Sequence, residues 1–176
     1  MANIISEQGF MKLHPDALIR SGTIIYDGST YGSHFITGHN AVIRENNTIG
    51  NRVVVGVHTY LGPGNIIGDD VKIHTSCFLE GVTLGNKVII APHVVFTNDP
   101  YPPCKKCVEE IGGATVGDGT VIGANATILP GVHIGKNCLI GAGSVVVADV
   151  EDEAVVVGNP ARMIKYKKDI IHKHTV

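Results

Sequence analysis

The chain has 176 residues, a length that fits a single domain. Its formal net charge is −2 with histidine counted as neutral, so electrostatics give no reason to expect binding to nucleic acid or to an anionic membrane. Hydrophobic residues make up 44% of the chain, yet we find neither a signal peptide nor an apolar run long enough to span a bilayer. We therefore expect one cytoplasmic domain whose four Cys residues are thiols or metal ligands rather than disulfides.

Residues 1–12 precede any regular pattern, and we expect them to cap the first open strand edge. From there an aliphatic residue recurs at almost every sixth position. The positions in this register are Leu13, Ile19, Ile25, Tyr31, Thr37, Ile43, Ile49, Val55, Leu61, Ile67, Ile73 and Leu79. Val, Ile and Thr favour strands, whereas the Gly and Asn residues between them suit tight corners. A six-residue period of this composition predicts a parallel β-helix with triangular coils of about eighteen residues.

A second inward position lies four residues after each aliphatic one, and it carries small side chains. Its occupants are Ala17, Thr23, Ala41, Val53, Thr59, Val71, Cys77, Val88, Val94, Thr120, Ala126, Val132, Cys138 and Ser144. The period loses one residue after Leu79, stops after Phe96 and returns from Val116 to Val146. We predict an all-β fold with about seven coils over residues 13–158 and one external loop near 97–115.

Residues 159–176 follow the last coil and should form a second cap. Pro160 stands at the start of the stretch that ends at Tyr166, and proline is common at the first position of a helix. We therefore expect a short C-terminal helical cap there.

The interruption from Thr97 to Thr115 is proline-rich at first and polar throughout. A loop of this length within a compact repeat fold is usually functional. We expect it to frame the active site, and a tolerated surface insertion is the alternative.

Three stretches carry a family resemblance: residues 72–74, 79–84 and 91–102, the last including Phe96-Thr97-Asn98-Asp99. They resemble the hexapeptide-repeat N-acetyltransferases that acetylate amino sugars on nucleotide carriers, in particular the type acting on 3-amino-3-deoxy sugars for polysaccharide biosynthesis. The resemblance implies left-handed winding, acetyl-CoA as co-substrate, a homotrimer, and a nucleotide-linked amino sugar as acceptor.

The related sugar and antibiotic O-acetyltransferases carry a His at this point of the chain. Here the matching stretch is Thr97-Asn98-Asp99-Pro100, which contains none. A hydroxyl needs a base when it attacks, whereas a neutral amine has its own lone pair and needs mainly to be positioned. The missing His therefore favours N-acylation over O-acylation.

Four residues are candidates for aiming the amine and handling its proton: His74, Glu80, Asn98 and Asp99. Three more are candidates for lining the substrate site: Thr97, Tyr101 and His93. Each has a plainer interpretation. Asn98 and Asp99 also suit a turn before Pro100, and His74 and His93 also suit exposed corners. Backbone N–H groups of a coil should stabilise the oxyanion.

In the family, the pantetheine arm lies between neighbouring subunits against small residues of the later coils. The matching residues are Gly123, Ala124, Gly141 and Ala142, although ordinary coil corners need small residues too. The Gly-Asn-Pro-Ala segment 158–161 matches a motif that packs by the adenine in CoA-using relatives. Pro160, Arg162 and Lys165 should bind CoA, with the cations facing its phosphates; a solvated tail is the alternative.

No metal is expected. The γ-type carbonic anhydrases share this repeat and bind zinc through three His residues, but here His58 and His93 lack a third partner near Asn98. The Cys104–Cys107 pair is a lone CxxC motif, and Cys77 and Cys138 occupy inward positions. His34, His39, His58 and His133 should point to solvent. An O-acetyltransferase of a sugar or small alcohol, a zinc enzyme of the γ-carbonic-anhydrase type and a non-catalytic spacer remain the alternatives.

Overall fold

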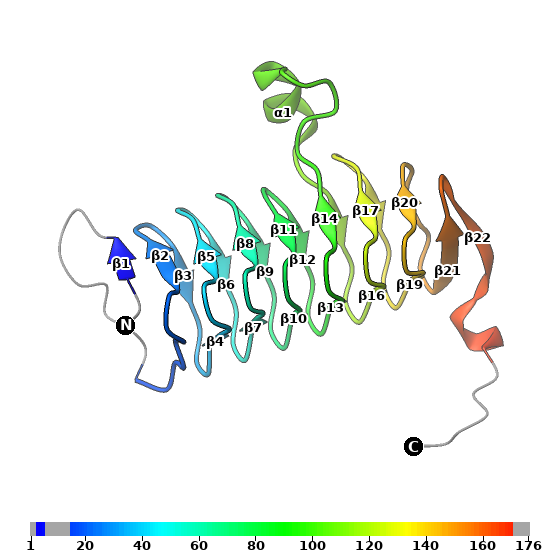
Figure 1. Ribbon diagram of the computed structural model, residues 1–176. Helices are drawn as coiled ribbons and strands as arrows, with labels where there is room; N and C mark the ends of the chain where they lie inside the picture. The colour runs from blue at the N-terminus through cyan, green and yellow to red at the C-terminus, as the bar shows by residue number, and fades with distance from the viewer. Residues whose placement is uncertain (1–2, 6–14, 171–176) are drawn as a thin grey trace.

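The computed structural model describes residues 3–5 and 15–170. The chain winds into a three-sided prism whose sides are three sheets, with one loop projecting from its flank (Figure 1). In each coil the chain passes from sheet A to sheet C, then to sheet B, and back to sheet A. We name the bends the A–C, C–B and B–A corners. Most strands are only two residues long, because each side of the prism spans a single six-residue repeat.

Successive strands of the coils belong in turn to sheets A, C and B. Sheet A consists of β1 (Asn3–Ile5), β2 (Ile24–Tyr26), β5 (Val42–Ile43), β8 (Tyr60–Leu61), β11 (Phe78–Leu79), β14 (Val95–Phe96), β17 (Thr127–Ile128) and β20 (Val145–Val146). Sheet B consists of β4 (Ile36–Thr37), β7 (Val54–Val55), β10 (Lys72–Ile73), β13 (Ile89–Ile90), β16 (Val121–Ile122), β19 (Leu139–Ile140), β21 (Ala154–Gly158) and β22 (Ala161–Tyr166). Sheet C consists of β3 (Thr30–Tyr31), β6 (Thr48–Ile49), β9 (Ile66–Ile67), β12 (Thr83–Leu84), β15 (Thr115–Val116) and β18 (His133–Ile134).

The core is a stack of aliphatic side chains inside the prism. The second residue of a strand points inward, so that Ile73 pairs with Val55 of the coil before and Ile90 of the coil after. The small inward positions are buried as predicted, including Cys77 and Cys138, except that Ala17 in the first coil is only partly buried. The predicted left-handed parallel β-helix with a hexapeptide repeat is confirmed.

Side chains at the corners join neighbouring coils through hydrogen bonds to the backbone. At the C–B corner, Asn51 N donates to Asp69 Oδ1 at 2.7 Å, and Asp69 N donates to Asn86 Oδ1 at 2.8 Å. Inside the prism, Asn65 Nδ2 donates to Asn47 Oδ1 at 2.8 Å, while Asn65 Oδ1 accepts from Val82 N at 3.0 Å. These side chains satisfy corner N–H groups that the short strands cannot pair.

The two ends are closed by strands. β1 adds to sheet A by pairing with β2, and the rest of the predicted N-terminal cap lies outside the described residues. The prediction of a helix beginning at Pro160 is wrong. Residues 161–166 instead form β22, which runs antiparallel to β21. The last strand of sheet B would otherwise leave its backbone unpaired, and this hairpin removes that open edge. Within the described part of this cap, up to residue 170, helical structure is limited to a 3₁₀ turn, η1 (Lys167–Asp169).

The predicted external loop leaves the prism after β14 and returns at β15. It contains α1 (Lys105–Ile111), which begins after Cys104 and ends at Gly112. Of the residues described, no helix is long or apolar enough to cross a membrane. Cys104 and Cys107 form a disulfide, so the expectation that all four Cys are thiols or metal ligands is wrong. One turn of helix places residues i and i+3 on the same face, which brings the two sulfurs together.

Candidate functional site

Glu80 and Asn98 meet at the foot of the loop. Both lie at the A–C corner, one coil apart, and Asn98 Nδ2 donates to Glu80 Oε1 at 2.7 Å. The Glu80 side chain extends over Gly62 of the preceding coil, where an added Cβ would lie 2.7 Å from Glu80 Cγ. A glycine at position 62 therefore leaves the room that Glu80 needs, a contribution that the sequence analysis missed. The signal was present in the sequence, because Gly62 precedes Glu80 by one coil length.

The loop foot is fastened to the coil that follows it. Thr97 Oγ1 donates to the carbonyl of Ile128 at 3.2 Å, so this hydroxyl anchors the loop. At the returning end, Gly131 N donates to the carbonyl of Gly112 at 3.2 Å. Both ends of the insertion are thus held against the corner formed by residues 129–131.

Asp99 is turned into the loop itself. Its Oδ1 accepts from Tyr101 N at 2.9 Å and its Oδ2 accepts from Cys104 N at 2.7 Å. Both carboxylate oxygens therefore organise the turn that follows Asn98. This is the turn-forming role that the sequence left open as the alternative to a catalytic role for Asp99. Tyr101 is 74% exposed at the tip of this turn.

His74 and His93 lie at the B–A corner, at the other end of sheet A from Glu80. Both side chains are exposed, and the His74 carbonyl accepts from Thr59 Oγ1 at 2.7 Å. A single chain therefore does not bring these His residues to the loop. His34, His39, His58 and His133 are exposed, as predicted.

Residues predicted to hold the cofactor gather along one edge of the prism. Gly123-Ala124 and Gly141-Ala142 occupy the B–A corners of consecutive coils, and the turn at Asn159-Pro160 continues the same edge. An added Cβ on Gly123 would lie 2.5 Å from Ala142 N, and one on Gly141 would lie 2.6 Å from Val157 Cγ1. The stacking of the coils therefore requires these two glycines whether or not a cofactor binds. The outer surface of this edge is left uncovered.

Arg162 lies beside a pocket of about 430 Å³ at the C-terminal end of the prism. Its walls are largely aliphatic, with Val146, Val150, Val156 and Met163 among them, and Asp149 and Glu151 also line it. Arg162 Nη1 donates to the carbonyl of Ala161 at 2.8 Å. Lys165 lies three residues along β22 and is exposed.

No group of three or more His, Cys, Asp or Glu side chains is placed to hold a metal within residues 3–5 and 15–170 of one chain. His58 and His93 stand at equivalent corner positions two coils apart, or about 10 Å at the usual strand spacing of ~4.8 Å. Two ligands of one zinc ion must lie much closer together than this.

Comparison with known proteins bears on this arrangement. A family model, bacterial transferase hexapeptide (six repeats), matches residues 113–148. The crystal structure of a maltose O-acetyltransferase from Clostridium difficile 630 is 30% identical, with a TM-score of 0.51, and the match covers 64% of this chain and 68% of that one. The chain belongs to the hexapeptide-repeat acetyltransferase family.

Two further members of the hexapeptide-repeat acetyltransferases are similar. A hexapeptide-repeat acetyltransferase from Vibrio cholerae, solved with acetyl coenzyme A, is 27% identical with a TM-score of 0.57, over 67% of this chain and 69% of that one. A 2,3,4,5-tetrahydropyridine-2,6-dicarboxylate N-acetyltransferase from Staphylococcus aureus is 36% identical over 88 residues, which is 50% of this chain and 34% of the relative. The chain spans about half the length of the curated relatives it matches first.

Proposed function

We propose that the protein is an acetyl-CoA-dependent N-acetyltransferase acting on the amine of a nucleotide-linked amino sugar. The observation that carries the proposal is the Glu80–Asn98 pair at the foot of the loop, joined at 2.7 Å. A carboxylate and an amide side by side suit an ammonium group, because both offer oxygen acceptors to its N–H donors. None of the described histidines lies at this corner.

The chemistry follows from what these two side chains offer. Bound acetyl-CoA supplies the acetyl group as a thioester. Asn98 donates its N–H to Glu80, which leaves the Asn98 carbonyl oxygen to accept a hydrogen bond from the amine. Once the ammonium has lost one proton, the neutral nitrogen would attack the acetyl carbon, the C–S bond of the thioester would break and CoA would leave as its thiolate. Glu80 accepts the proton that the nitrogen loses as its new bond forms. The two side chains thus orient the amine and remove its proton.

The B–A edge fits the donor. Ala124 and Ala142 have short side chains at consecutive corners, so an extended chain can lie against the backbone there. Arg162, with Lys165 nearby on β22, places positive charge at the C-terminal end of this edge, where phosphates of CoA would bind. Asp149 and Glu151, which also line the Arg162 pocket, would repel phosphates, so the phosphates should bind close to the guanidinium of Arg162.

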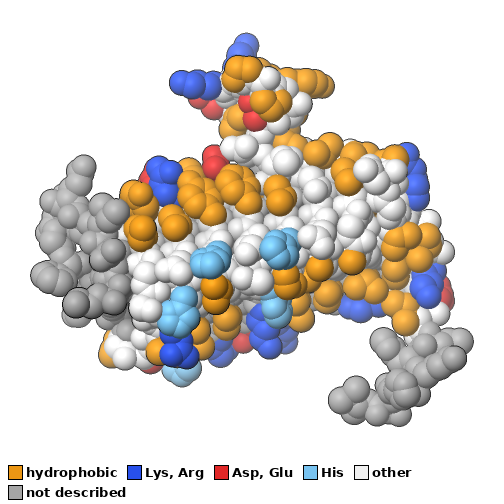
Figure 2. Space-filling model, in the orientation of Figure 1, with side chains coloured by type: hydrophobic (Ala, Val, Ile, Leu, Met, Phe, Trp, Pro, Cys, Tyr) orange, Lys and Arg blue, Asp and Glu red, His pale blue; other side chains and the backbone are white. Residues whose placement is uncertain are grey.

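We propose that the protein forms a homotrimer, and the outer faces of the sheets support association. The outward residues of sheet A are almost all apolar: Ile24, Val42, Tyr60, Phe78, Val95, Thr127 and Val145. Those of sheet C are mostly polar: Thr30, Thr48, Ile66, Thr83, Thr115 and His133. Figure 2 shows hydrophobic side chains side by side along the N-terminal half of sheet A. A continuous apolar face of this kind marks an interface.

A threefold arrangement with sheet A facing the axis would complete the site. Each chain's B–A corner would then stand beside the A–C corner of the next chain, and such head-to-tail contacts close into a ring. The edge that carries His74 and the cofactor residues would face the Glu80–Asn98 pair of a second copy. We propose that the acetyl group is transferred in this groove.

O-acetylation of a sugar is the second candidate. The similarity to a maltose O-acetyltransferase favours it, and so does the proximity that the ring gives to His74 and His93, either of which could act as the base that a hydroxyl requires. A zinc site built from three His, Cys, Asp or Glu ligands among the described residues would need more than one chain.

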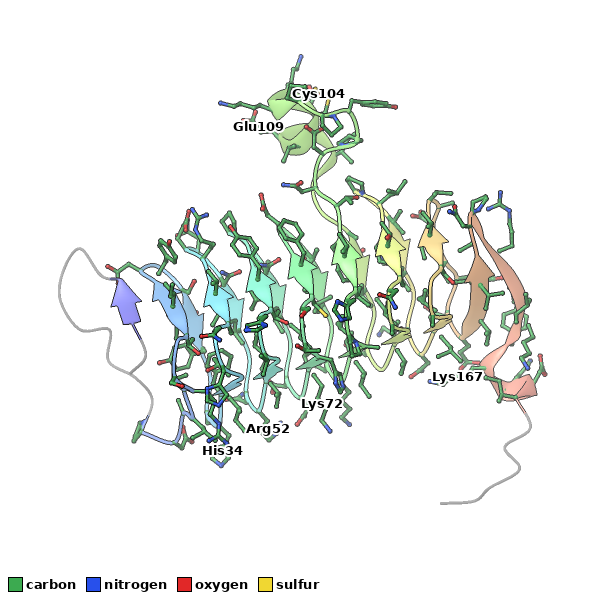
Figure 3. The ribbon with its side chains drawn as sticks, in the orientation of Figure 1. His34, Arg52, Lys72, Cys104, Glu109 and Lys167 are labelled. Atoms are coloured by element: carbon green, nitrogen blue, oxygen red, sulfur yellow. A yellow bond between two sulfur atoms is a disulfide. The ribbon has the colours of Figure 1, made fainter. Side chains whose placement is uncertain are left out.

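The test is acetyl-CoA turnover, read as released thiol, on a panel of nucleotide-linked 3-amino and 4-amino sugars and matched hydroxyl sugars. For N-acetylation we expect Glu80→Gln to lower kcat by about 10²-fold or more, with His93→Asn much milder. His34→Asn, on the remote C–B corner, is the matched control (Figure 3). Turnover confined to hydroxyl sugars, together with a larger loss in a His variant than in Glu80→Gln, would establish the O-acetyltransferase instead.

A further inference from the structure

The two loop cysteines differ from the other two in accessibility. Cys77 and Cys138 are buried in the core, and burial raises the pKa of both thiols. Cys104 and Cys107 are only half-buried, on a loop held away from the prism (Figure 3). Thiol–disulfide exchange requires access and a thiolate, so the loop pair is the reactive one.

A purely structural role does not account for this disulfide. The two residues are three positions apart, and a cross-link that closes so short a segment restricts the unfolded chain least. It joins no two strands, and the strand ladders of the prism hold without it. The effect of the bond must therefore be local to the loop.

The disulfide is connected to the candidate site through one hydrogen-bonded turn. Cys104 N donates to Asp99 Oδ2 at 2.7 Å, and Cys104 Sγ accepts from Cys107 N at 3.3 Å. Asp99 directly follows Asn98, whose amide donates to Glu80. Asp99 and the disulfide therefore hold the two ends of the segment 99–107, which directly follows Asn98. This segment in turn positions Asn98.

The surroundings of the pair favour exchange. Lys105 and Lys106 stand between the two cysteines and are exposed, and positive charge favours the thiolate that attacks in exchange. α1 carries no buried residue, and it is held in place by the disulfide, the Asp99 turn, the hydrogen bond from Gly131 N to the Gly112 carbonyl and the contact of Ile111 with the next corner. Loss of one of these restraints should loosen the segment.

We propose that Cys104–Cys107 is a reversible redox pair that controls how well the loop positions the acceptor, which makes the oxidised form the more active one. A dithiol reductant would reduce it: one thiolate attacks a sulfur of the pair, the mixed disulfide is resolved by the second thiol, and the reductant leaves as its own disulfide. Two electrons pass to the protein, and Cys104 and Cys107 become thiols. The link to activity rests on the proposed transferase function, whereas the redox chemistry does not.

The experiment equilibrates the full chain in buffers of reduced and oxidised dithiothreitol. Alkylation followed by mass spectrometry counts the free thiols, and hydrogen exchange follows the amides of Tyr101 and Cys104. We expect two thiols to appear and disappear reversibly, and exchange at these amides to rise at least tenfold on reduction. The double variant Cys104→Ser/Cys107→Ser should show fast exchange in every buffer.

Acetyl transfer is measured on the same samples. We expect reduction to raise KM for the acceptor severalfold in the wild type and to leave the double variant unchanged. If the cysteines stay reduced in every buffer, bind zinc instead, or oxidise without slowing the exchange of these amides, the proposal is wrong. If the pair behaves as expected but no acceptor is acetylated, the proposed transferase function fails and the redox control of the loop stands.

Discussion

Glu80 occupies a corner position at which many hexapeptide repeats carry glycine, and its environment shows how far one residue can be placed from sequence. Because Phe78 pairs with Val95, Thr97 takes the position equivalent to Glu80 in the next coil, and Asn98 follows it closely enough to reach Glu80 with a hydrogen bond. The orientation of Asp99 does not follow. An Asp before Pro100 can face a substrate or cap its own turn, and only the positions of Tyr101 N and Cys104 N decide between these roles.

The buried amide of Asn65 illustrates how much one side chain contributes at this scale. It donates to Asn47 Oδ1 and to the Gly62 carbonyl, each at 2.8 Å, and accepts from Val82 N. Asn65→Leu would remove the side-chain bonds to Asn47 Oδ1, to the Gly62 carbonyl and to Val82 N, although Asn47 Oδ1 would still accept from the backbone N–H of residue 65. Each buried group left without a partner costs about 1–3 kcal/mol. We expect a clearly lower midpoint of urea unfolding at fixed protein concentration. Thr48→Ala, on the exposed face of sheet C, should change the midpoint little; equal midpoints for both variants would contradict this account.

At the scale of elements, the sequence predicts the strands correctly within the six-residue repeat, whereas the predictions for the segments outside the repeat fail. The strands follow from the six-residue period, since each inward aliphatic residue defines one. α1 was missed although Pro103 precedes it and Gly112 ends it, because those signals lie within a segment that has no period. Pro160 suggested a helix, but the open edge of β21 provides backbone partners that make a strand of residues 161–166. Such tertiary pairing is invisible to local propensity.

At the C–B corner, the pKa of Asp69 predicts how the stability of the fold depends on pH. Hydrogen bonds from Asn51, first from its backbone N–H, lower the pKa of Asp69. A carboxyl whose pKa is lower in the folded than in the unfolded chain stabilises the fold above its unfolded-state pKa, near 4. That stabilisation is lost as the pH falls through the folded-state pKa.

We therefore expect Asp69→Asn to lower Tm at pH 7, and the difference from wild type to shrink as the pH falls below about 4. Thermal unfolding followed by circular dichroism between pH 7 and pH 3 measures this, with Glu109→Gln on α1 as the control. A difference that stays constant over this range would show that the charge of Asp69 is not responsible.

At the scale of the whole molecule, the outer face of sheet A is apolar whereas that of sheet C is mostly polar, and this difference favours assembly through sheet A. Phe78 packs against Tyr60 with ring centroids 5.3 Å apart, at the centre of the apolar face. A carboxylate there would be desolvated by a second copy without a partner. We expect Phe78→Glu to sediment as a folded monomer and to lose most acetyl transfer, because the two halves of the site separate.

Thr83→Glu places the same charge on the polar outer face of sheet C and should remain trimeric. Analytical ultracentrifugation distinguishes the species directly. A wild type that sediments as a monomer, or a Phe78→Glu variant that remains trimeric and active, would remove sheet A from the interface.

The loop enters the prism without disturbing it. Thr83 pairs with Thr115 and Leu84 with Val116 across the insertion, in the same register that joins coils with no insertion between them. The framework therefore constrains the two ends of the segment between β14 and β15, where Thr97 and Gly112 bond to the next coil, and leaves the length of the loop between them free. Descendants of such a scaffold could exchange this segment whole and acquire a new acceptor while keeping the donor edge unchanged. Grafting the loop of a relative between Phe96 and Ala114 would thus be a route to altered substrate choice that leaves the solenoid intact.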